Sequence, residues 1–419
     1  MNAAALLAAV TIFTPDFLKA PPEACGLPVA TTPPKVDVCV IKDLPAGSGE
    51  HWTNMADGCL ASTGRFYTGI GNCLEFAAGP GQSRLYEYDP AAKRLHLVTE
   101  VRDALSDPNI AVGKLHSRID EGGDGWLYFA TYWGQDPNEP DWAGFKGSAL
   151  MRFDPRSGQC EYLGIPAWGQ GLPCSRLDAK RMILYAVAVP GNDFLAYDLQ
   201  AKGVRYRGSG DVLQGNRHVM LDSAGEAYFS TKSGALAQYD PDTNAVRITK
   251  AVLPVDPRLA AEGKTDSLRA SAEPTGDGTV YGITTSGMLF AFDPATETVQ
   301  DLGPDVGDGE YAVVLAASRD GKYLYYGLTS PDGAVKYGCP IIQYRTSTRT
   351  RKVLAFLKAV LRERLGYHIS RLYNMRLSPD GSTLFCTFNG APVAAEGRQQ
   401  EDFYQPAVVV VHIPESERP

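Results

Sequence analysis

Short runs in which apolar and polar residues alternate fill most of this chain, and a turn signal separates each run from the next. The runs are rich in Tyr, Phe and Val, while 43 Gly and 29 Pro are spread along the chain. Alternation with a period of two gives a strand one apolar and one polar face, and Asp-Gly between two such runs favours a tight hairpin. The pattern therefore predicts an all-β fold made of many short antiparallel strands.

A short phrase, aromatic-Asp-Pro, recurs where an alternating run ends. Full copies begin at Tyr88, Phe153, Tyr239 and Phe292, and a weaker copy begins at Tyr197. The copies are spaced by roughly 42 to 65 residues, which is the length of a four-stranded propeller blade with variable loops. A hairpin phrase such as DEGGDGWLYFATY precedes each copy. Together the two phrases supply the four strands of one blade.

The repeat predicts a single seven-bladed β-propeller over residues 36–415, preceded by an N-terminal extension, residues 1–35. The seventh blade has only three strands before the chain ends, the last of them AVVVVHI. The surplus strand Val36–Leu44 can complete this blade, which would close the propeller and remove two sheet edges. The predicted blades begin near Trp52, His116, Cys174, His218, Arg269, Val314 and Asn374.

Composition limits which binding partners and which cellular location are expected. The net charge of −8 and the pI of about 5.4 argue against bulk binding of nucleic acid. The apolar run Ala3–Phe13 has the length of a signal-peptide core, but no Lys or Arg precedes it and it is too short to span a membrane. The location stays open, with secretion or the periplasm slightly favoured, and we expect a monomer. The eight cysteines form no Cys-x-x-Cys pair, so we expect most of them to be buried thiols.

A column of mostly polar residues emerges when the hairpin phrases are aligned on their turns. The first strands of propeller blades surround a central channel, so these side chains are expected to face it. The column has two interpretations: a wet channel that tolerates polar groups, or an anion-binding mouth whose Arg forks suit a planar carboxylate. It contains Asp57, His116, Cys174, His218, Arg269, Val314 and Asn374, and its neighbours include Arg118, Arg176, Arg217, Tyr373 and Arg376.

Long loops are predicted to emerge on the same face as this mouth. Two of them, residues 132–148 and 389–406, carry several aromatic residues. Rings beside charged groups suit a sugar, which stacks its faces and bonds through its hydroxyls. For each single aromatic residue the alternative is packing inside the loop. The candidates for substrate contact are Tyr132, Trp133 and Trp142, with Phe145 and Tyr404 nearby.

A metal site has weak support. Only His51, His116, His218 and His368 are placed to approach the mouth, and no His-x-x-x-His spacing occurs. We therefore expect no cofactor, with a divalent metal as the alternative. No Gly-x-Ser-x-Gly, P-loop or dinucleotide motif stands in a suitable strand–turn–helix context.

The phrase DEGGDGWLYFATY, residues 120–132, resembles the repeat of the virginiamycin-B-lyase-type propellers. The wider arrangement, with His116 and His218 on first strands beside several Arg, is similar to propeller polysaccharide lyases that act on uronic acids. These are the ulvan, oligogalacturonate and rhamnose–glucuronate lyases. The oligogalacturonate branch is the least similar, since it relies on a His-rich metal cluster that cannot be assembled here. The resemblance implies β-elimination on an acidic oligo- or polysaccharide.

Such a lyase removes the C5 proton beside a uronate carboxylate, and the 4-linked group leaves. The reaction needs a base, an acid and a group that neutralises the carboxylate. The resemblance implies catalytic roles for His116, His218, Tyr373, Arg176 and Arg269, and substrate binding by Arg118, Arg217, Asn374, Tyr132, Trp133 and Trp142.

Two other functions stay open. A gluconolactonase-like, metal-dependent hydrolase needs a carboxylate-rich channel, and the aligned column offers only Asp57. A non-catalytic propeller that binds a glycan or a protein would tolerate the loss of both His116 and His218. The fold by itself does not separate these functions.

Overall fold

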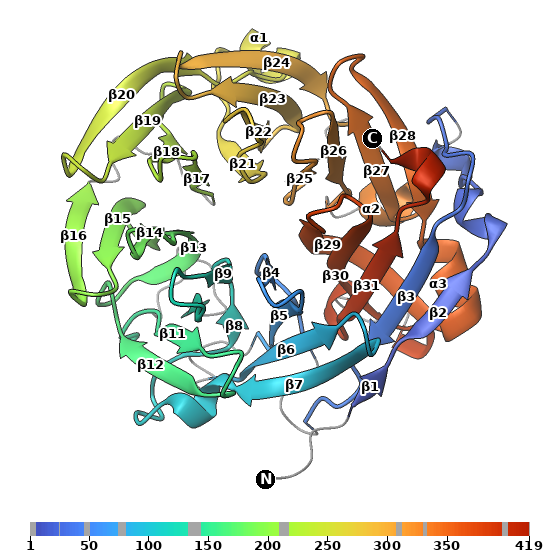
Figure 1. The fold of residues 1–419 in the computed structure, drawn as a ribbon, viewed down its shortest axis with the longest axis horizontal. Helices are drawn as coiled ribbons and strands as arrows, with labels where there is room; N and C mark the ends of the chain where they lie inside the picture. Colours follow the sequence, from blue (N-terminus) through green and yellow to red (C-terminus); the bar gives the residue numbers. More distant parts are fainter. Residues whose placement is uncertain are drawn as a thin grey trace. The chain divides into compact units, whose positions relative to one another are not determined.

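The computed structural model contains seven antiparallel β-sheets (Figure 1). It describes residues 6–24, 26–45, 51–73, 81–132, 144–208, 218–306, 312–329, 333–395 and 401–418. The chain divides into two compact units, which are described separately below. Unit 1 comprises residues 1–8, 41–229 and 237–247, and unit 2 comprises residues 9–40, 230–236 and 248–419.

Three sheets lie entirely in unit 1, and in each the strands follow the chain from the first strand of the blade to the last. Strand β1 adds to the outer edge of the first sheet, where Leu7 pairs with Leu95 of β7. The first sheet contains β1 (Leu7–Ala8), β4 (Cys59–Leu60), β5 (Phe66–Gly71), β6 (Ser83–Asp89) and β7 (Arg94–Glu100). The second contains β8 (Lys114–Leu115), β9 (Asp120–Glu121), β10 (Leu127–Tyr132), β11 (Leu150–Phe153) and β12 (Cys160–Gly164). The third contains β13 (Gly171–Asp178), β14 (Ile183–Val189), β15 (Asp193–Asp198) and β16 (Gly203–Gly208).

Three of the other four sheets repeat this order, and the last combines strands from both ends of the chain. The fourth sheet contains β17 (Met220–Leu221), β18 (Ala227–Ser230), β19 (Ala235–Asp240) and β20 (Ala245–Val252), and the fifth contains β21 (Leu268–Ser271), β22 (Val280–Thr284), β23 (Met288–Asp293) and β24 (Thr298–Pro304). The sixth contains β25 (Ala316–Ala317), β26 (Tyr323–Tyr326), β27 (Pro340–Arg345) and β28 (Thr350–Phe356). The seventh contains β2 (Val10–Phe13), β3 (Lys35–Val40), β29 (Tyr367–Leu377), β30 (Thr383–Pro392) and β31 (Ala407–His412).

Helices are short and lie in the connections between strands. Among the described residues, no helix is both long enough and apolar enough to cross a lipid bilayer. The α-helices are α1 (Pro257–Ala261), α2 (Gly333–Lys336) and α3 (Lys358–Leu365), and the 3-10 turns are η1 (Pro15–Leu18), η2 (Pro22–Ala24), η4 (Val101–Ala104), η6 (Val393–Ala395), η7 (Glu401–Phe403) and η8 (Glu415–Glu417).

The last sheet takes a strand from each end of the chain. Strand β31 lies between β30 and β3, and Lys35 to Val40 of β3 pair with His412 to Ala407 of β31 (Figure 1). This confirms the prediction that the surplus N-terminal strand completes the seventh blade. Strand β2 then pairs with β3 through Val10 and Val38, so the sheet has a fifth strand. Seven such blades make the fold an all-β, seven-bladed β-propeller, as predicted.

The seventh blade begins earlier than the sequence pattern indicates. Its first strand, β29, starts at Tyr367 and not near Asn374, and it follows helix α3, which ends at Gly366 in the left-handed region with φ 60°. The register of β29 against β30 shifts between Ile369 and Leu372 and again before Asn374. These two irregularities hide the extra length of the strand, because they interrupt the alternation that a regular strand shows.

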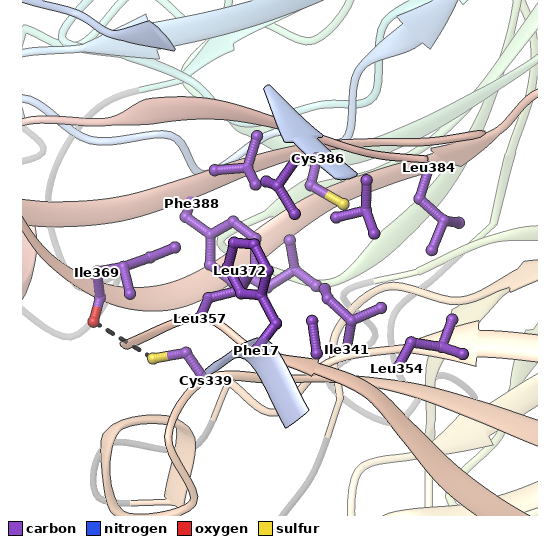
Figure 2. Packing of buried hydrophobic residues seen from close by; sticks show 14 of the residues in the cluster. Phe17, Cys339, Ile341, Leu354, Leu357, Ile369, Leu372, Leu384, Cys386 and Phe388 are labelled. Atoms are coloured by element: carbon purple, nitrogen blue, oxygen red, sulfur yellow. Dashed lines mark hydrogen bonds between the residues drawn. The ribbon is translucent and has the colours of Figure 1, made fainter. Parts of the chain in front are cut away.

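An apolar core of unit 2 joins the sixth and seventh blades (Figure 2). Phe17 of η1 is fully buried there, against the side chains of β27, β28, β29 and β30. Closely packed apolar side chains of this kind supply most of the folding free energy, at about 25 cal/mol for each Å² removed from water. The labelled members are Phe17, Cys339, Ile341, Leu354, Leu357, Ile369, Leu372, Leu384, Cys386 and Phe388.

Cysteines contribute to such cores as thiols. The seven cysteines in the described part of the chain are free, and five of them are buried. Burial raises the pKa of the Cys339 and Cys386 thiols, because apolar surroundings disfavour the thiolate. Cys339 also donates a hydrogen bond of 3.3 Å to the carbonyl oxygen of Ile369. These residues therefore act as small apolar side chains, as predicted.

Candidate functional site

His116 is held at the end of the first strand of the second blade. Strand β8 pairs with β10, Leu115 opposite Thr131, and His116 follows directly. Its Nδ1 lies 2.6 Å from the carbonyl oxygen of Pro173 on β13 of the next blade. A carbonyl oxygen only accepts hydrogen bonds, so Nδ1 carries the proton, and when the ring is neutral its basic nitrogen is Nε2. This is the tautomer that lets Nε2 act as a base.

The ring of Tyr132 packs beside the imidazole of His116. The two ring centroids are 5.0 Å apart, at an angle of 55°, and Tyr132 is 8% exposed. Gly171 makes this arrangement possible, because a Cβ there would lie 2.5 Å from the Tyr132 ring. The imidazole of His116 is thus oriented by the Pro173 carbonyl and by an aromatic neighbour.

Arg118 is engaged by two carboxylates. Its Nε lies 2.6 Å from Asp120, and its Nη1 lies 4.0 Å from Asp57 of the preceding blade. Asp120 also accepts a hydrogen bond of 3.0 Å from the backbone N–H of Leu177 on β13. These contacts join the first strands of three blades in unit 1. They also balance the charge of Arg118, which makes it a poorer partner for a substrate carboxylate than the sequence suggests.

Arg176 and His218 complete the predicted set in unit 1. Arg176 lies on β13, opposite Tyr185 of β14, and is only 3% exposed. His218 is half-buried and comes two residues before the first strand of its blade, β17. Both therefore lie at first strands, as the alignment predicts. That His116 and His218 face a common cavity stays a prediction.

The predicted residues of unit 2 lie on two first strands, β21 and β29. Arg269 stands at the register shift between Leu268 and Ala270 and is half-buried. Tyr373 is half-buried on β29, and Asn374 beside it is fully buried. The side-chain amide of Asn374 donates to the hydroxyl of Thr387 at 3.3 Å. This hydrogen bond helps to hold β29 against β30.

A buried ionic cluster near the start of β29 was missed by the sequence analysis. Nε2 of His368 lies 3.6 Å from Asp402, and Nη2 of Arg371 donates to the same carboxylate at 3.2 Å. The guanidinium of Arg371 covers the ring of Phe403, 4.6 Å from its centroid. Burial alone would raise the pKa of Asp402, but the contacts with His368 and Arg371 outweigh it and lower this pKa. The partners lie more than 30 positions apart, so no local motif reveals them.

Trp168 is a second residue that the sequence analysis missed. It is 72% exposed, in the connection between β12 and β13 that leads to Pro173. The connection is fixed, because the N–H of Gly169 donates to the carbonyl of Lys146 at 2.9 Å and Arg207 donates to the Gln170 side chain at 2.6 Å. An exposed indole on a fixed loop is a suitable platform for a sugar ring. The signal was available in the sequence: a Trp within the Gly-rich phrase AWGQG.

The two long loops add few residues to the candidate site among those that the structure describes. Trp133, Trp142 and Arg217 lie outside the described residues. Phe145 is 4% exposed, so it packs into unit 1 and is not open to a ligand. Tyr404 is half-buried, and its N–H donates to the carbonyl of Gly390 at 3.0 Å.

Within the described ranges, no group of three or more His, Cys, Asp or Glu side chains is arranged to hold a metal ion. The Asp402 cluster contains one His and one carboxylate, with Arg371 as its cation.

Comparison with known proteins gives the fold alone. No family model matches the chain, and no curated protein matches it. Among solved structures it is similar to the protein described as U3-55K, with a TM-score of 0.53, 10% identity and coverage of 90% of this chain and 98% of that one. It is likewise similar to the RRP9 WD40 repeats, with a TM-score of 0.52, 9% identity and coverage of 94% and 100%.

A third similar structure is the extracellular domain of a one-component system from B. thetaiotaomicron, with a TM-score of 0.49 and 14% identity. The match covers 85% of this chain and 40% of the other, so this chain spans less than half the length of that protein. At these identities the likeness extends to architecture and not to the reaction. The chain is thus a seven-bladed β-propeller whose solved neighbours include WD40-repeat propellers.

Proposed function

We propose that this propeller is a polysaccharide lyase that cleaves a uronic-acid-containing glycan by β-elimination. The observation that carries the proposal is the 2.6 Å hydrogen bond from Nδ1 of His116 to the Pro173 carbonyl. It fixes the tautomer in which Nε2 is the basic nitrogen, and Tyr132 fixes the ring plane. A base held in one tautomer on a first strand is what proton abstraction at a sugar carbon requires.

In this reaction Nε2 of His116 accepts the proton from C5 of the uronate. The electron pair of the C5–H bond forms the C4–C5 double bond, and the C4–O bond breaks. The leaving oxygen takes a proton from an acid, for which His218 is the candidate in unit 1. The proton at C5 becomes acidic enough only when the neighbouring carboxylate is neutralised.

Arg176 is the candidate for neutralising the carboxylate in unit 1. Arg118 is less suited, because Asp57 and Asp120 already balance its charge. Arg176 keeps its proposed catalytic role, although only 3% of the residue is exposed. The catalytic roles expected of Arg269 and Tyr373, which belong to unit 2, stay predictions, and Asn374 is the least suited because it is fully buried.

An assay for unsaturated sugar products tests this proposal. The protein is incubated with a panel of uronate-containing polysaccharides, and the ultraviolet absorbance of the new C4–C5 double bond is followed. Absorbance that rises with wild type and not with His116→Ala supports the lyase. A panel on which wild type produces no unsaturated ends counts against it.

A non-catalytic glycan-binding propeller is the second candidate. It is favoured by the ion pairs of Arg118 with Asp57 and Asp120 and by the burial of Asn374, which suit a structural role better than turnover. It is also supported by Trp168, whose exposed ring can hold a sugar without any chemistry. Binding of an acidic oligosaccharide without any unsaturated product would support this function in place of the lyase.

A further inference from the structure

A pocket of about 280 Å³ opens on the sixth blade of unit 2, on its outer strands β27 and β28. None of its residues belongs to the proposed lyase machinery. Its walls combine an aromatic ring, a proline, polar groups and cations. The lining residues that matter here are Pro28, Tyr323, Gln343, Arg345, Thr350 and Arg351, with Lys352 beside them.

The hairpin that forms this pocket is strongly basic in an acidic protein. The segment from Arg345 to Lys352 has four cationic residues and no Asp or Glu, whereas the whole chain has a net charge of −8. Register places Arg345 opposite Thr350, and Gln343 opposite Lys352. Residues two apart on a strand share a face, so these four side chains lie on the same face of the blade.

The cations of the pocket differ in how their charge is compensated. Lys352 forms an ion pair with the buried carboxylate of Glu417. Arg345 instead lies over the ring of Tyr323, 5.5 Å from its centroid. Nη2 of Arg351 donates to the neutral carbonyl of Pro304 at 2.8 Å. Arg351 stands between Thr350 and Lys352 on β28, so its side chain lies on the opposite face of the strand. Arg345 is therefore the cation on the pocket face that, among the described residues, forms no ion pair with a carboxylate.

We propose that this pocket binds a tetrahedral oxyanion, as a phosphate or sulfate group on a small ligand. The guanidinium of Arg345 lies on the pocket face over the Tyr323 ring, and its fork matches the oxygens of such a group. The hydroxyl of Thr350 adds a donor, and Tyr323 and Pro28 offer an apolar wall to the organic part of the ligand. The cavity is smaller than most sites for drug-sized molecules, which suits a single charged group with a small substituent.

Titration calorimetry with inorganic phosphate, inorganic sulfate and acetate, at constant ionic strength, tests the site. Wild type is expected to bind phosphate or sulfate with a Kd on the order of 1 mM, and acetate at least about tenfold more weakly. Arg345→Gln is expected to weaken binding at least about tenfold, whereas Arg351→Gln, whose side chain lies on the other face of β28, should bind as wild type does. Arg345 is exposed and Arg351 is half-buried, so the variants should fold, which circular dichroism checks. Tight binding of phosphate alone identifies a phosphate ester, and binding of both anions extends the site to sulfate esters.

Arg349→Gln is the matched control. Arg349 is exposed in the same turn and carries the same charge, but it does not line the pocket. Its variant should bind as wild type does. The proposal is overturned if wild type binds neither anion, if acetate binds as tightly as phosphate, or if Arg349→Gln weakens binding as much as Arg345→Gln does.

Discussion

His412 and Asp37 stand 375 positions apart in the sequence, yet Nε2 of His412 lies 2.8 Å from a carboxylate oxygen of Asp37. Asp37 is 1% exposed on β3, and its other oxygen accepts a hydrogen bond from the hydroxyl of Thr11 on β2. One buried carboxylate therefore links the C-terminal strand to two N-terminal strands. A charge is kept in such a place only when it is paired and hydrogen-bonded.

Replacing Asp37 should weaken the link between the C-terminal strand and the two N-terminal strands. Asp37→Ala leaves Thr11 and His412 without their acceptor, so we expect the free energy of unfolding to fall by about 2 kcal/mol, the scale for hydrogen bonds to a charged group. Urea denaturation at neutral pH measures this as a lower midpoint. Lys35→Ala, at an exposed position of the same strand, should change the free energy by less than about 0.5 kcal/mol. Equal midpoints for the two variants would contradict the role of Asp37.

The blade repeat could be predicted because it rests on local rules. Alternation and turn residues define strands wherever they occur. A last blade with only three strands is most simply completed by the surplus strand Val36–Leu44. The extra strands β1 and β2 could not be found in this way. Residues 3–13 form one apolar run, and only the partner strands β7 and β3 decide which of them pair.

Glu417 should make the stability of unit 2 depend on pH. It is 3% exposed, and burial alone would raise its pKa; the contacts with Lys352 and Thr31 outweigh this and lower the pKa from 4.5 to about 2. A carboxyl with a lowered pKa stabilises the fold above its unfolded value, and this contribution is lost as the pH falls through the folded value. Glu417→Gln should therefore lower Tm near neutral pH, and the difference from wild type should shrink as the pH falls from 4.5 to about 2.

Glu415→Gln is the control for this effect. Glu415 is exposed in the same 3-10 turn, η8, so its variant should follow wild type across the pH range. Thermal denaturation of the three proteins in matched buffers gives the comparison. A constant difference in Tm between wild type and Glu417→Gln at every pH would show that the carboxylate of Glu417 is not the source of the stability.

Trp168 should contribute to glycan binding whether or not the protein is a lyase. Trp168→Ala removes the stacking surface, and we expect affinity for a bound oligosaccharide to fall about tenfold, or about 1.4 kcal/mol. Trp168→Phe should keep most of the affinity, because a smaller ring still stacks. Phe13→Ala removes an equally exposed ring, 69% against 72%, from β2 and should bind as wild type does. Unchanged affinity of Trp168→Ala in calorimetry would remove Trp168 from the site.

The candidate site could be predicted only in part, for a physical reason. Residue type and strand position are visible in the sequence, so Arg176 was correctly placed on a first strand, β13, and His116 and Arg118 lie beside one, between the short strands β8 and β9. Hydrogen-bond partners on other blades are not visible: Pro173 is 57 positions from His116. One pairing did have a local signal. Arg118 and Asp120 are two residues apart, on the same side of an extended segment, so their ion pair follows from the strand period.

His116 is the residue on which the proposed reaction depends. His116→Ala should lower turnover on a uronate polysaccharide by at least about a hundredfold, the usual scale for losing a general base. Tyr132→Phe keeps the ring that contacts the imidazole and should retain most of the activity. His96→Ala changes a half-buried histidine on β7, 3.6 Å from Glu87, and should leave turnover unchanged. Initial rates of unsaturated product measure all three, with circular dichroism to confirm folding. If His116→Ala and His218→Ala both keep full activity, the histidines are not the acid and base; if activity disappears only with a chelator, a metal takes their place.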